Sequence, residues 1–144
     1  MKLALRVAMM FVCLVSLAFA ADPLDTAHKI LPEELAKQVN AGKAPLILNI
    51  GPRRLFDQAH IKGAEFIGPT SKPDGIAKLD ERVKTLPKNT AIVLYCGCCP
   101  WANCPNATPG LAELVKLGFT KVKVLYIANN IGADWVDKGY PTEK

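Results

Sequence analysis

The sequence lacks the features of a nucleic-acid-binding or membrane-embedded protein. Its formal net charge of +5 is not gathered into any run of lysine or arginine, whereas a nucleic-acid interface needs a clustered basic stripe. After residue 20, no segment is long and apolar enough to cross a bilayer. Internal repeats and low-complexity linkers are also absent. We therefore expect a single globular domain with no nucleic-acid partner and no stable membrane anchor.

The long apolar run of the sequence lies at its N-terminus. In "MKLALRVAMMFVCLVSLAFA", Lys2 and Arg6 precede the apolar residues, and small residues surround a cleavage site after Ala20. This pattern predicts a secretory signal peptide over residues 1–20 and a domain over residues 21–144. The proline and acidic residues that follow argue against a membrane anchor. We therefore expect a periplasmic or secreted protein whose net charge, after the loss of two basic residues, is about +3.

Cysteine is absent from most of the chain. Cys13 lies in the predicted signal peptide, and the other four, Cys96, Cys98, Cys99 and Cys104, lie in the stretch "LYCGCCPWANCPNATPG". Thiols of exported proteins tend to be oxidised. However, no cysteine elsewhere in the domain can link distant parts of the fold. The chemistry of these four thiols is therefore expected to be local.

Strand patterns alternate with helical patterns along the domain. Short apolar runs predict strands, and apolar residues at helical spacing predict helices that end near glycine or proline. The predicted strands cover residues 45–50, 91–95 and 121–126 and part of 61–68, and the predicted helices cover 32–42, 53–60, 74–86, 109–119 and 132–141. In the helix of residues 109–119, Leu111, Leu114 and Val115 are expected to face inward. The alternation predicts an α/β fold, a parallel sheet with helices on both faces.

The cysteine stretch begins where the predicted central strand ends. Cys96 directly follows residues 91–95, and sites in parallel sheets lie at the carboxyl ends of strands. The loop leads into a helix expected to begin near Asn106 or Thr108, with Pro109 in its first turn. Backbone N–H groups there favour negative charge, which lowers the pKa of a cysteine below about 8.5. The pattern predicts a nucleophilic thiolate at Cys96; the alternative is an inert buried cysteine.

Several segments, taken in order, resemble one family. These are "LPEELAKQVNAGKAPLILNI", "RRLFDQAHIKGAEFIGP", "AIVLYC", "LAELVKLGFTKVKVLYI" and "WVDKGYPTEK". Together they resemble a single-domain rhodanese, a sulfurtransferase, over nearly all of the chain after residue 20. The resemblance implies that Cys96 takes a sulfane sulfur from a donor as a persulfide and passes it to an acceptor such as cyanide or a thiol. It also implies a structural role for His60, and no metal or organic cofactor.

The loop departs from the family pattern at the position of its arginine. The family has an arginine five residues after the catalytic cysteine, and this sequence has Trp101. Arg53 and Arg54 are candidates to supply positive charge from a neighbouring loop. The predicted substrate is a small sulfur-containing anion, with a thiol as acceptor. The predicted substrate-binding residues are Gly97, Cys98, Trp101, Arg53 and Arg54.

Additional thiols take the place of the arginine. Cys96 and Cys99 form a C-x-x-C pair, and Cys104 follows. A neighbouring thiol can attack a persulfide and release its sulfur while a disulfide closes. Cys99 or Cys104 is therefore predicted as a resolving thiol beside the nucleophile Cys96, which also suggests a redox partner protein. Cys98 is the weaker candidate.

Two non-enzymatic interpretations of the loop stay open. In one, a disulfide from Cys98 or Cys99 to Cys104 shapes the loop. In the other, the thiolates hold a soft metal, Zn²⁺ or Cu(I). Two features count against a metal: all ligands lie in one loop, and the adjacent Cys98 and Cys99 are expected to point in different directions. A thioredoxin-like protein shares the C-x-x-C pair but not the surrounding layout.

Overall fold

Helices and strands alternate along the chain as predicted. The computed structural model describes residues 26–144, so the predicted signal peptide lies outside the described residues. The strands are β1 (Lys29–Ile30), β2 (Leu46–Asn49), β3 (His60–Ile61), β4 (Glu65–Phe66), β5 (Ala91–Tyr95), β6 (Lys121–Leu125) and β7 (Thr142–Glu143). The helices are α1 (Pro32–Asn40), α2 (Arg53–Gln58), α3 (Pro73–Val83) and α4 (Ala107–Lys116), with short turns η1 (Thr26–His28), η2 (Trp101–Asn103) and the π-helical η3 (Gly132–Val136). Over residues 26–144, none of the helices has the length and apolarity that a bilayer span requires.

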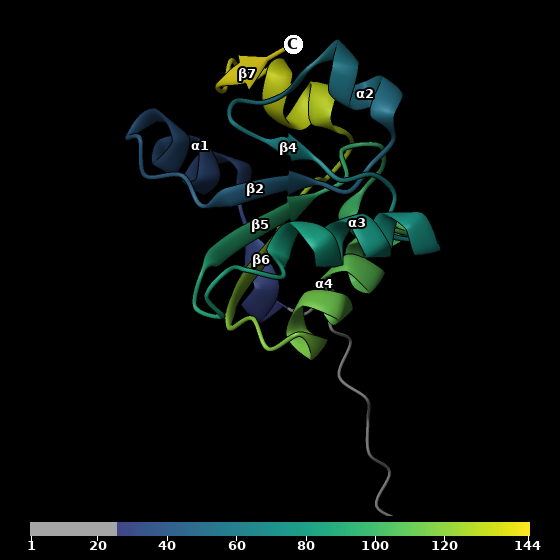
Figure 1. The fold of residues 1–144 in the computed structure, drawn as a ribbon. Helices are drawn as coiled ribbons and strands as arrows, with labels where there is room; N and C mark the ends of the chain where they lie inside the picture. The colour runs from purple at the N-terminus through teal and green to yellow at the C-terminus, as the bar shows by residue number, and fades with distance from the viewer. Residues whose placement is uncertain (1–25) are drawn as a thin grey trace, which may run out of the picture.

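Five strands form a parallel sheet in the order β1-β6-β5-β2-β4 (Figure 1). The central strand β5 pairs with β2 and β6 on its two sides, with Asn49 opposite Tyr95 and Leu94 opposite Val124. Because all five strands run in the same direction, their carboxyl ends share one edge. The sequence pattern does not predict the additional antiparallel pair of β3 and β7, whose strands are only two residues long.

Helices cover both faces of the sheet, which confirms the predicted fold class. In Figure 1, α3 and α4 lie on one side of the sheet, while α1 and the C-terminal segment lie on the other. The side chains of β5 alternate between two cores: Ile92 and Leu94 pack toward α3 and α4, and Val93 and Tyr95 pack toward α1 and η3. This alternation is the ordinary period of two along a strand, and it decides which face receives the residue after β5.

One predicted core position on α4 is wrong. Leu111 and Leu114 are fully buried, as expected, but Val115 is 48% exposed. Successive residues of an α-helix are rotated by about 100°. Because Leu114 points straight into the core, Val115 is turned toward solvent. The core continues instead at Phe119, which is buried just after the helix ends.

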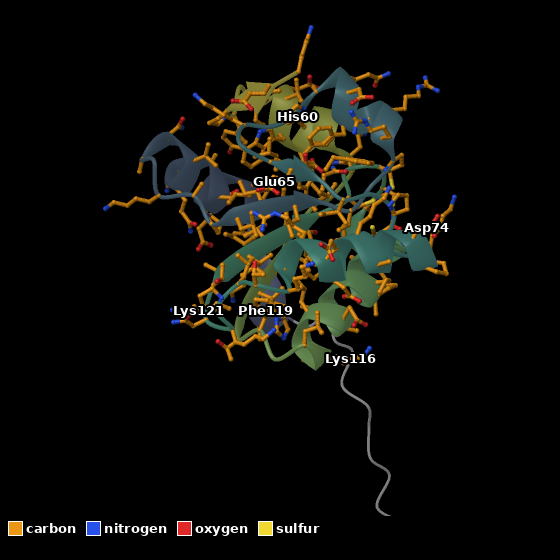
Figure 2. The ribbon with its side chains drawn as sticks, in the orientation of Figure 1. His60, Glu65, Asp74, Lys116, Phe119 and Lys121 are labelled. Carbon is orange, nitrogen blue, oxygen red and sulfur yellow. The ribbon has the colours of Figure 1, made fainter. Side chains whose placement is uncertain are left out.

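The amino and carboxyl ends of the parallel strands lie at opposite ends of the molecule. Lys121 begins β6 and Asp74 lies in the first turn of α3, and Figure 2 shows them at opposite ends of the molecule. The end that carries Asp74 is the carboxyl edge of the sheet, where loops leave β2, β4, β5 and β6. Cys96 lies at this edge, directly after β5.

Candidate functional site

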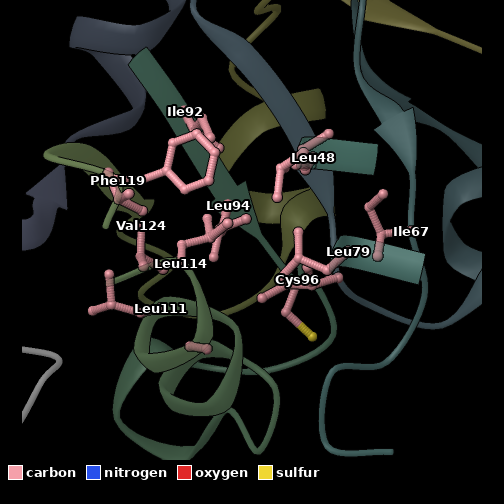
Figure 3. Close-up of a cluster of buried hydrophobic side chains, with 14 residues drawn as sticks. Leu48, Ile67, Leu79, Ile92, Leu94, Cys96, Leu111, Leu114, Phe119 and Val124 are labelled. Carbon is pink, nitrogen blue, oxygen red and sulfur yellow. The ribbon is translucent and has the colours of Figure 1, made fainter. Parts of the chain in front are cut away.

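Cys96 lies at the boundary between the core and the carboxyl edge. It continues the face of β5 that carries Ile92 and Leu94, and its side chain belongs to the core beneath α3 and α4. The residue is only 6% exposed. In Figure 3 its sulfur points away from the centre of the cluster of buried side chains. The sheet therefore holds the backbone of Cys96 while its sulfur faces the loop that follows.

Two glycines let neighbouring segments approach Cys96 closely. A Cβ atom on Gly51, just after β2, would lie 2.2 Å from the carbonyl oxygen of Cys96. Gly97 has a φ of +80°, a left-handed conformation that other residues rarely adopt. Its carbonyl oxygen accepts a 2.9 Å hydrogen bond from the N–H of Ile131, which precedes η3. Gly97, a predicted substrate-binding residue, therefore has a clear structural role in turning the loop.

The four cysteine sulfurs lie together. Cys98 Sγ is 3.1 Å from Cys96 Sγ and 3.1 Å from Cys99 Sγ. The sulfurs of Cys96, Cys99 and Cys104 all lie within 4.8 Å of one another. All four residues are free thiols. The expectation that Cys98 and Cys99 point in different directions is therefore wrong, because the backbone bends at both residues and brings their side chains together.

Asn106 is the residue of this site that the sequence pattern does not reveal. It is 4% exposed, and its amide nitrogen donates a 3.2 Å hydrogen bond to Cys96 Sγ. Its amide oxygen accepts a 3.0 Å bond from the backbone N–H of Ser71, which holds the amide in this orientation. Asparagine is common before a helix, where its side chain usually caps the first turn. Here Asn106 precedes α4 but makes no side-chain cap, so that ordinary signal conceals its contact with the thiol.

The surroundings of Cys96 stabilise its thiolate. The thiol of Cys104 donates to the sulfur, and with Asn106, the Cys98 thiol and the Cys98 backbone N–H it outweighs burial and lowers the pKa of Cys96 to about 5. Burial and the neighbouring thiols raise the pKa of Cys98. The pKa of Cys104 is also raised, chiefly by its hydrogen bond to Cys96. The predicted activation of Cys96 is supported, but its main donors are neighbouring side chains rather than the helix N-terminus.

A small cavity lies among three of the thiols. Cys96, Cys99 and Cys104 contribute to its walls, and its volume of about 10 Å³ is close to the space of one water molecule. The remaining walls are apolar side chains and glycine: Gly97, Trp101, Ala107, Val124, Leu125 and Ile127. This space admits a single atom but not a whole substrate molecule.

A larger groove lies beside Cys98. Its volume is about 430 Å³, and it runs between the end of α2, with Leu55 and Gln58, and the segment around Ile131. Cys98 lines this groove, whereas the other three cysteines do not. A still larger cavity of about 530 Å³ lies at the amino ends of β5 and β6. It has no cysteine in its walls, so we place the chemistry at the carboxyl edge.

Trp101 lines the small cavity. Its backbone N–H donates a 2.7 Å hydrogen bond to the carbonyl oxygen of Ile127, which ties the loop to the end of β6. Its ring is half-buried against the core and lies 6.0 Å from the ring of Tyr126, measured between centroids. Trp101 therefore packs the loop against the core and forms part of the wall of the cavity beside Cys96.

The two arginines point to other partners. The guanidinium group of Arg53 binds Asp57 at 2.8 Å and lies 4.8 Å from the centre of the Phe66 ring. Arg54 is exposed on α2. Neither arginine lines the small cavity or the groove. Their predicted role in substrate binding stays a prediction, and the donors that the structure places on Cys96 are uncharged.

His60 has a structural environment, as the resemblance implies. Its Nδ1 lies 2.9 Å from the carbonyl oxygen of Phe56, and its ring stacks on the Phe56 ring at a centroid distance of 3.9 Å. It holds the end of α2 to β3 and does not line the cavities beside the cysteines.

These features define an α/β protein with a thiol of lowered pKa at the end of its central strand. Comparison with known families matches residues 31–126, more than half of the chain, to the Rhodanese-like domain. The chain therefore belongs to the rhodanese-like domain family, in agreement with the resemblance of its sequence. A search of curated proteins finds no match.

Solved structures support the same fold. The crystal structure of the Alr3790 protein from Anabaena sp. has a TM-score of 0.59 at 23% identity, covering 79% of this chain and 90% of that chain. An NMR structure of the rhodanese-like domain of that protein has a TM-score of 0.57 at 23% identity, covering 81% of this chain and 78% of that domain. The crystal structure of a protein from Lactobacillus plantarum has a TM-score of 0.59 at 20% identity, covering 82% of this chain and 89% of that chain. At these identities the likeness shows the fold alone.

Proposed function

We propose that this protein transfers sulfane sulfur through a persulfide on Cys96. The single observation that supports this proposal is the hydrogen-bonded setting of Cys96, which lowers its pKa to about 5 at the end of the central strand. A cysteine with this pKa is a thiolate at neutral pH, and the thiolate is the nucleophile in sulfur chemistry. Membership of the rhodanese-like family supports a sulfurtransferase-type reaction.

The first step is attack of the Cys96 thiolate on the terminal sulfur of a donor. With thiosulfate, the new S–S bond forms on Cys96, the donor's S–S bond breaks, and sulfite leaves with its electron pair. The small cavity beside Cys96 has room for the one transferred sulfur, so the rest of the donor stays outside. The donors that stabilise the thiolate, Asn106 and Cys104, also stabilise the persulfide anion.

The second step passes the sulfur to an acceptor by way of Cys98. Cys98 Sγ is 3.1 Å from Cys96 Sγ, and Cys98 lines the 430 Å³ groove. Cys98 gives up its proton to solvent and attacks the outer sulfur, and Cys96 leaves as a thiolate. The persulfide then lies on Cys98, beside the groove where a thiol acceptor fits. Attack on the inner sulfur instead closes a Cys96–Cys98 disulfide and releases sulfide, which couples transfer to thiol redox chemistry. A redox partner protein then reduces the disulfide.

This assignment favours Cys98 over the two resolving thiols suggested by the sequence. The sulfurs of Cys99 and Cys104 are within 4.8 Å of Cys96 Sγ, but neither residue lines the groove. Both Cys98 and Cys104 donate hydrogen bonds to the Cys96 sulfur, so the groove beside Cys98 is the feature that separates the two thiols. Cys99 and Cys104 therefore serve the site from the enclosed side.

Intact-protein mass spectrometry tests both steps. Reduced, metal-free protein is incubated with thiosulfate, and separately with a polysulfide, and compared with Cys96→Ser and Cys98→Ser. We expect wild-type protein to gain one sulfur, about 32 Da, or to lose two hydrogens as the disulfide closes. Cys98→Ser should hold the added sulfur without forming that disulfide, and should transfer it to an added thiol more slowly.

The control variant is Cys96→Ser, which should show neither change. An unchanged mass of wild-type protein with both donors, or a gain that persists in Cys96→Ser, contradicts the transferase proposal. Equal disulfide formation in Cys98→Ser and wild type would assign the resolving role to Cys99 or Cys104. Peptide mapping of the disulfide identifies which of them is used.

A further inference from the structure

Three of the thiols surround a space of atomic size. The sulfurs of Cys96, Cys99 and Cys104 lie within 4.8 Å of one another, and together they line the 10 Å³ cavity. They come from a single loop between β5 and α4, whose two ends are held by the sheet and the helix. The three sulfurs therefore lie around one small space.

Their spacing fits a three-coordinate metal ion. A metal–thiolate bond of about 2.3 Å places three sulfurs about 4.0 Å apart around an ion in their plane. The sulfurs of this cluster satisfy an upper bound of 4.8 Å for every pair, so small side-chain rotations bring all three to bonding distance. The sheet and α4 keep their places while this happens.

The walls of the cavity select a soft ion. Apart from the three sulfurs, its lining side chains are apolar, and they include Trp101, Val124 and Ile127. Hard cations such as Mg²⁺ and Ca²⁺ require oxygen ligands, whereas thiolates suit softer metals such as Cu(I) and Zn²⁺. Zn²⁺ usually takes four ligands. The fourth thiol, Cys98, lies 3.1 Å from the sulfurs of Cys96 and Cys99 but lines the groove and not this cavity, so the sulfurs around the cavity offer Zn²⁺ one ligand too few.

Donors around the sulfurs complete the site. Asn106 Nδ2 donates to Cys96 Sγ at 3.2 Å, and the backbone N–H groups of Asn106 and Ala107 form hydrogen bonds to the Cys104 sulfur. Such outer partners orient metal ligands and spread the negative charge of the thiolates. No charged side chain lines the cavity. A monovalent ion offsets one of the three thiolate charges, and these donors stabilise the negative charge that is left.

We propose that Cys96, Cys99 and Cys104 bind one Cu(I) ion in trigonal thiolate coordination. Binding forms three Cu–S bonds and releases the remaining thiol protons to solvent, with no change in oxidation state. The ion fills the space that the transferred sulfur would take, so Cu(I) and sulfane sulfur compete for Cys96. The copper site itself requires neither a sulfur donor nor an acceptor, and it stands apart from the transferase proposal.

Anaerobic titration of the reduced protein with Cu(I) against bicinchoninate tests this site. We expect one ion per chain, with X-ray absorption showing three sulfur neighbours at about 2.3 Å. Cys99→Ser and Cys104→Ser should each weaken Cu(I) binding by about 100-fold or more, beyond the roughly 10–100-fold cost of losing an outer partner. The matched control is Cys98→Ser, which removes a neighbour of the Cys96 and Cys99 sulfurs but no ligand, so it should lose no more than the roughly 10–100-fold of an outer partner and less than either ligand variant.

Alkylation of wild-type protein gives a second readout that needs no variant to fold. With Cu(I) bound, iodoacetamide should label Cys98 while Cys96, Cys99 and Cys104 are protected. The proposal is overturned by protection of all four thiols, by an equal loss of affinity in Cys98→Ser, or by no binding in competition with bicinchoninate. A Zn²⁺ complex that requires all four sulfurs and resists Cu(I) would also overturn it. Failure of sulfur loading alone leaves these copper results unchanged.

Discussion

At the scale of single residues, the site stabilises a thiolate with neutral donors. The family's loop arginine is replaced by Trp101, and Cys96 instead receives hydrogen bonds from Cys104, Asn106 and Cys98. Hydrogen bonds to a charged group contribute about 1.5–3 kcal/mol each, so two or three of them can offset the cost of burial. Asn106 is the donor best held in place, because Ser71 binds the other end of its amide.

Replacing Asn106 by aspartate should raise the pKa of Cys96. Asn106→Asp keeps an oxygen to accept the Ser71 N–H, but it removes the donor to Cys96 Sγ and places a carboxylate beside the thiolate. A hydrogen bond of this kind corresponds to about 1–2 pKa units. The pKa is measured from the pH dependence of iodoacetamide alkylation, followed at Cys96 by mass spectrometry.

The wild-type profile supplies the baseline for this measurement. With a pKa of about 5, the alkylation rate should be constant at neutral pH and fall about tenfold per unit below pH 5, because the protonated thiol is unreactive. The Asn106→Asp profile should be displaced to higher pH. Superimposable profiles would show that Asn106 does not stabilise the thiolate.

At the scale of the elements, the site depends on how closely the ends of β2 and β5 approach. Gly51 follows β2, and its N–H donates to the side chain of the buried Asn49, in the last position of that strand. A methyl group on Gly51 would meet the backbone oxygen of Cys96 at 2.2 Å. Because that obstacle is backbone, directly after the paired strand β5, it cannot rotate away as a side chain can. Packing between two strand ends therefore sets the position of the thiol.

Gly51→Ala should destabilise the fold and disturb Cys96 together. We expect the free energy of unfolding to fall by about 1–3 kcal/mol, as overpacking does elsewhere, and the alkylation rate of Cys96 to change. The control is Gly42→Ala at the end of α1, where a Cβ meets nothing within 4 Å and only the φ of +67° is unfavourable. It should cost about 1 kcal/mol without affecting Cys96. Urea unfolding and alkylation measure the two effects, and equal behaviour of the two variants would contradict this account.

At the scale of the whole molecule, a hydrophobic core packs on each face of the sheet, and neither core covers the carboxyl edge. The face under α3 and α4 ends at Cys96, and the opposite face is closed by α1 and the fully buried Trp135 of η3. A sheet covered on both faces is stable without disulfides, and all four cysteines of the described residues are free thiols.

We propose that the protein is exported and works in an oxidising compartment. The expected processing is cleavage after Ala20 by a signal peptidase, which requires small residues before the cut. Intact mass spectrometry of protein recovered from the periplasm or medium should give a chain that begins at Ala21. Ala18→Arg should leave the precursor uncleaved. Recovery of the uncut wild-type chain from the cytoplasm would contradict export.

Much of the fold follows from patterns that are local in the sequence. The run of residues 91–95 and the helical spacing around Leu111 and Leu114 are visible because burial imposes periods of 2 and 3.6 residues. The family resemblance adds the expected role of Cys96. The two-residue strands β1, β3 and β7 are too short to show a period. Val115 is misassigned because an apolar pattern along a helix does not show where the buried face of that helix ends.

In the candidate site too, some features follow from the sequence and others only from the tertiary structure. The sequence alone determined that a cysteine follows the central strand, that three more thiols lie near it in the chain, and that the usual arginine is missing. Only the tertiary structure decided that Cys98 faces the groove while Cys99 and Cys104 share a cavity with Cys96. It also decided that Asn106 contacts the thiol, through a bond held from Ser71, 35 residues away. The directions of side chains in an irregular loop depend on packing against distant segments, and no local period encodes them.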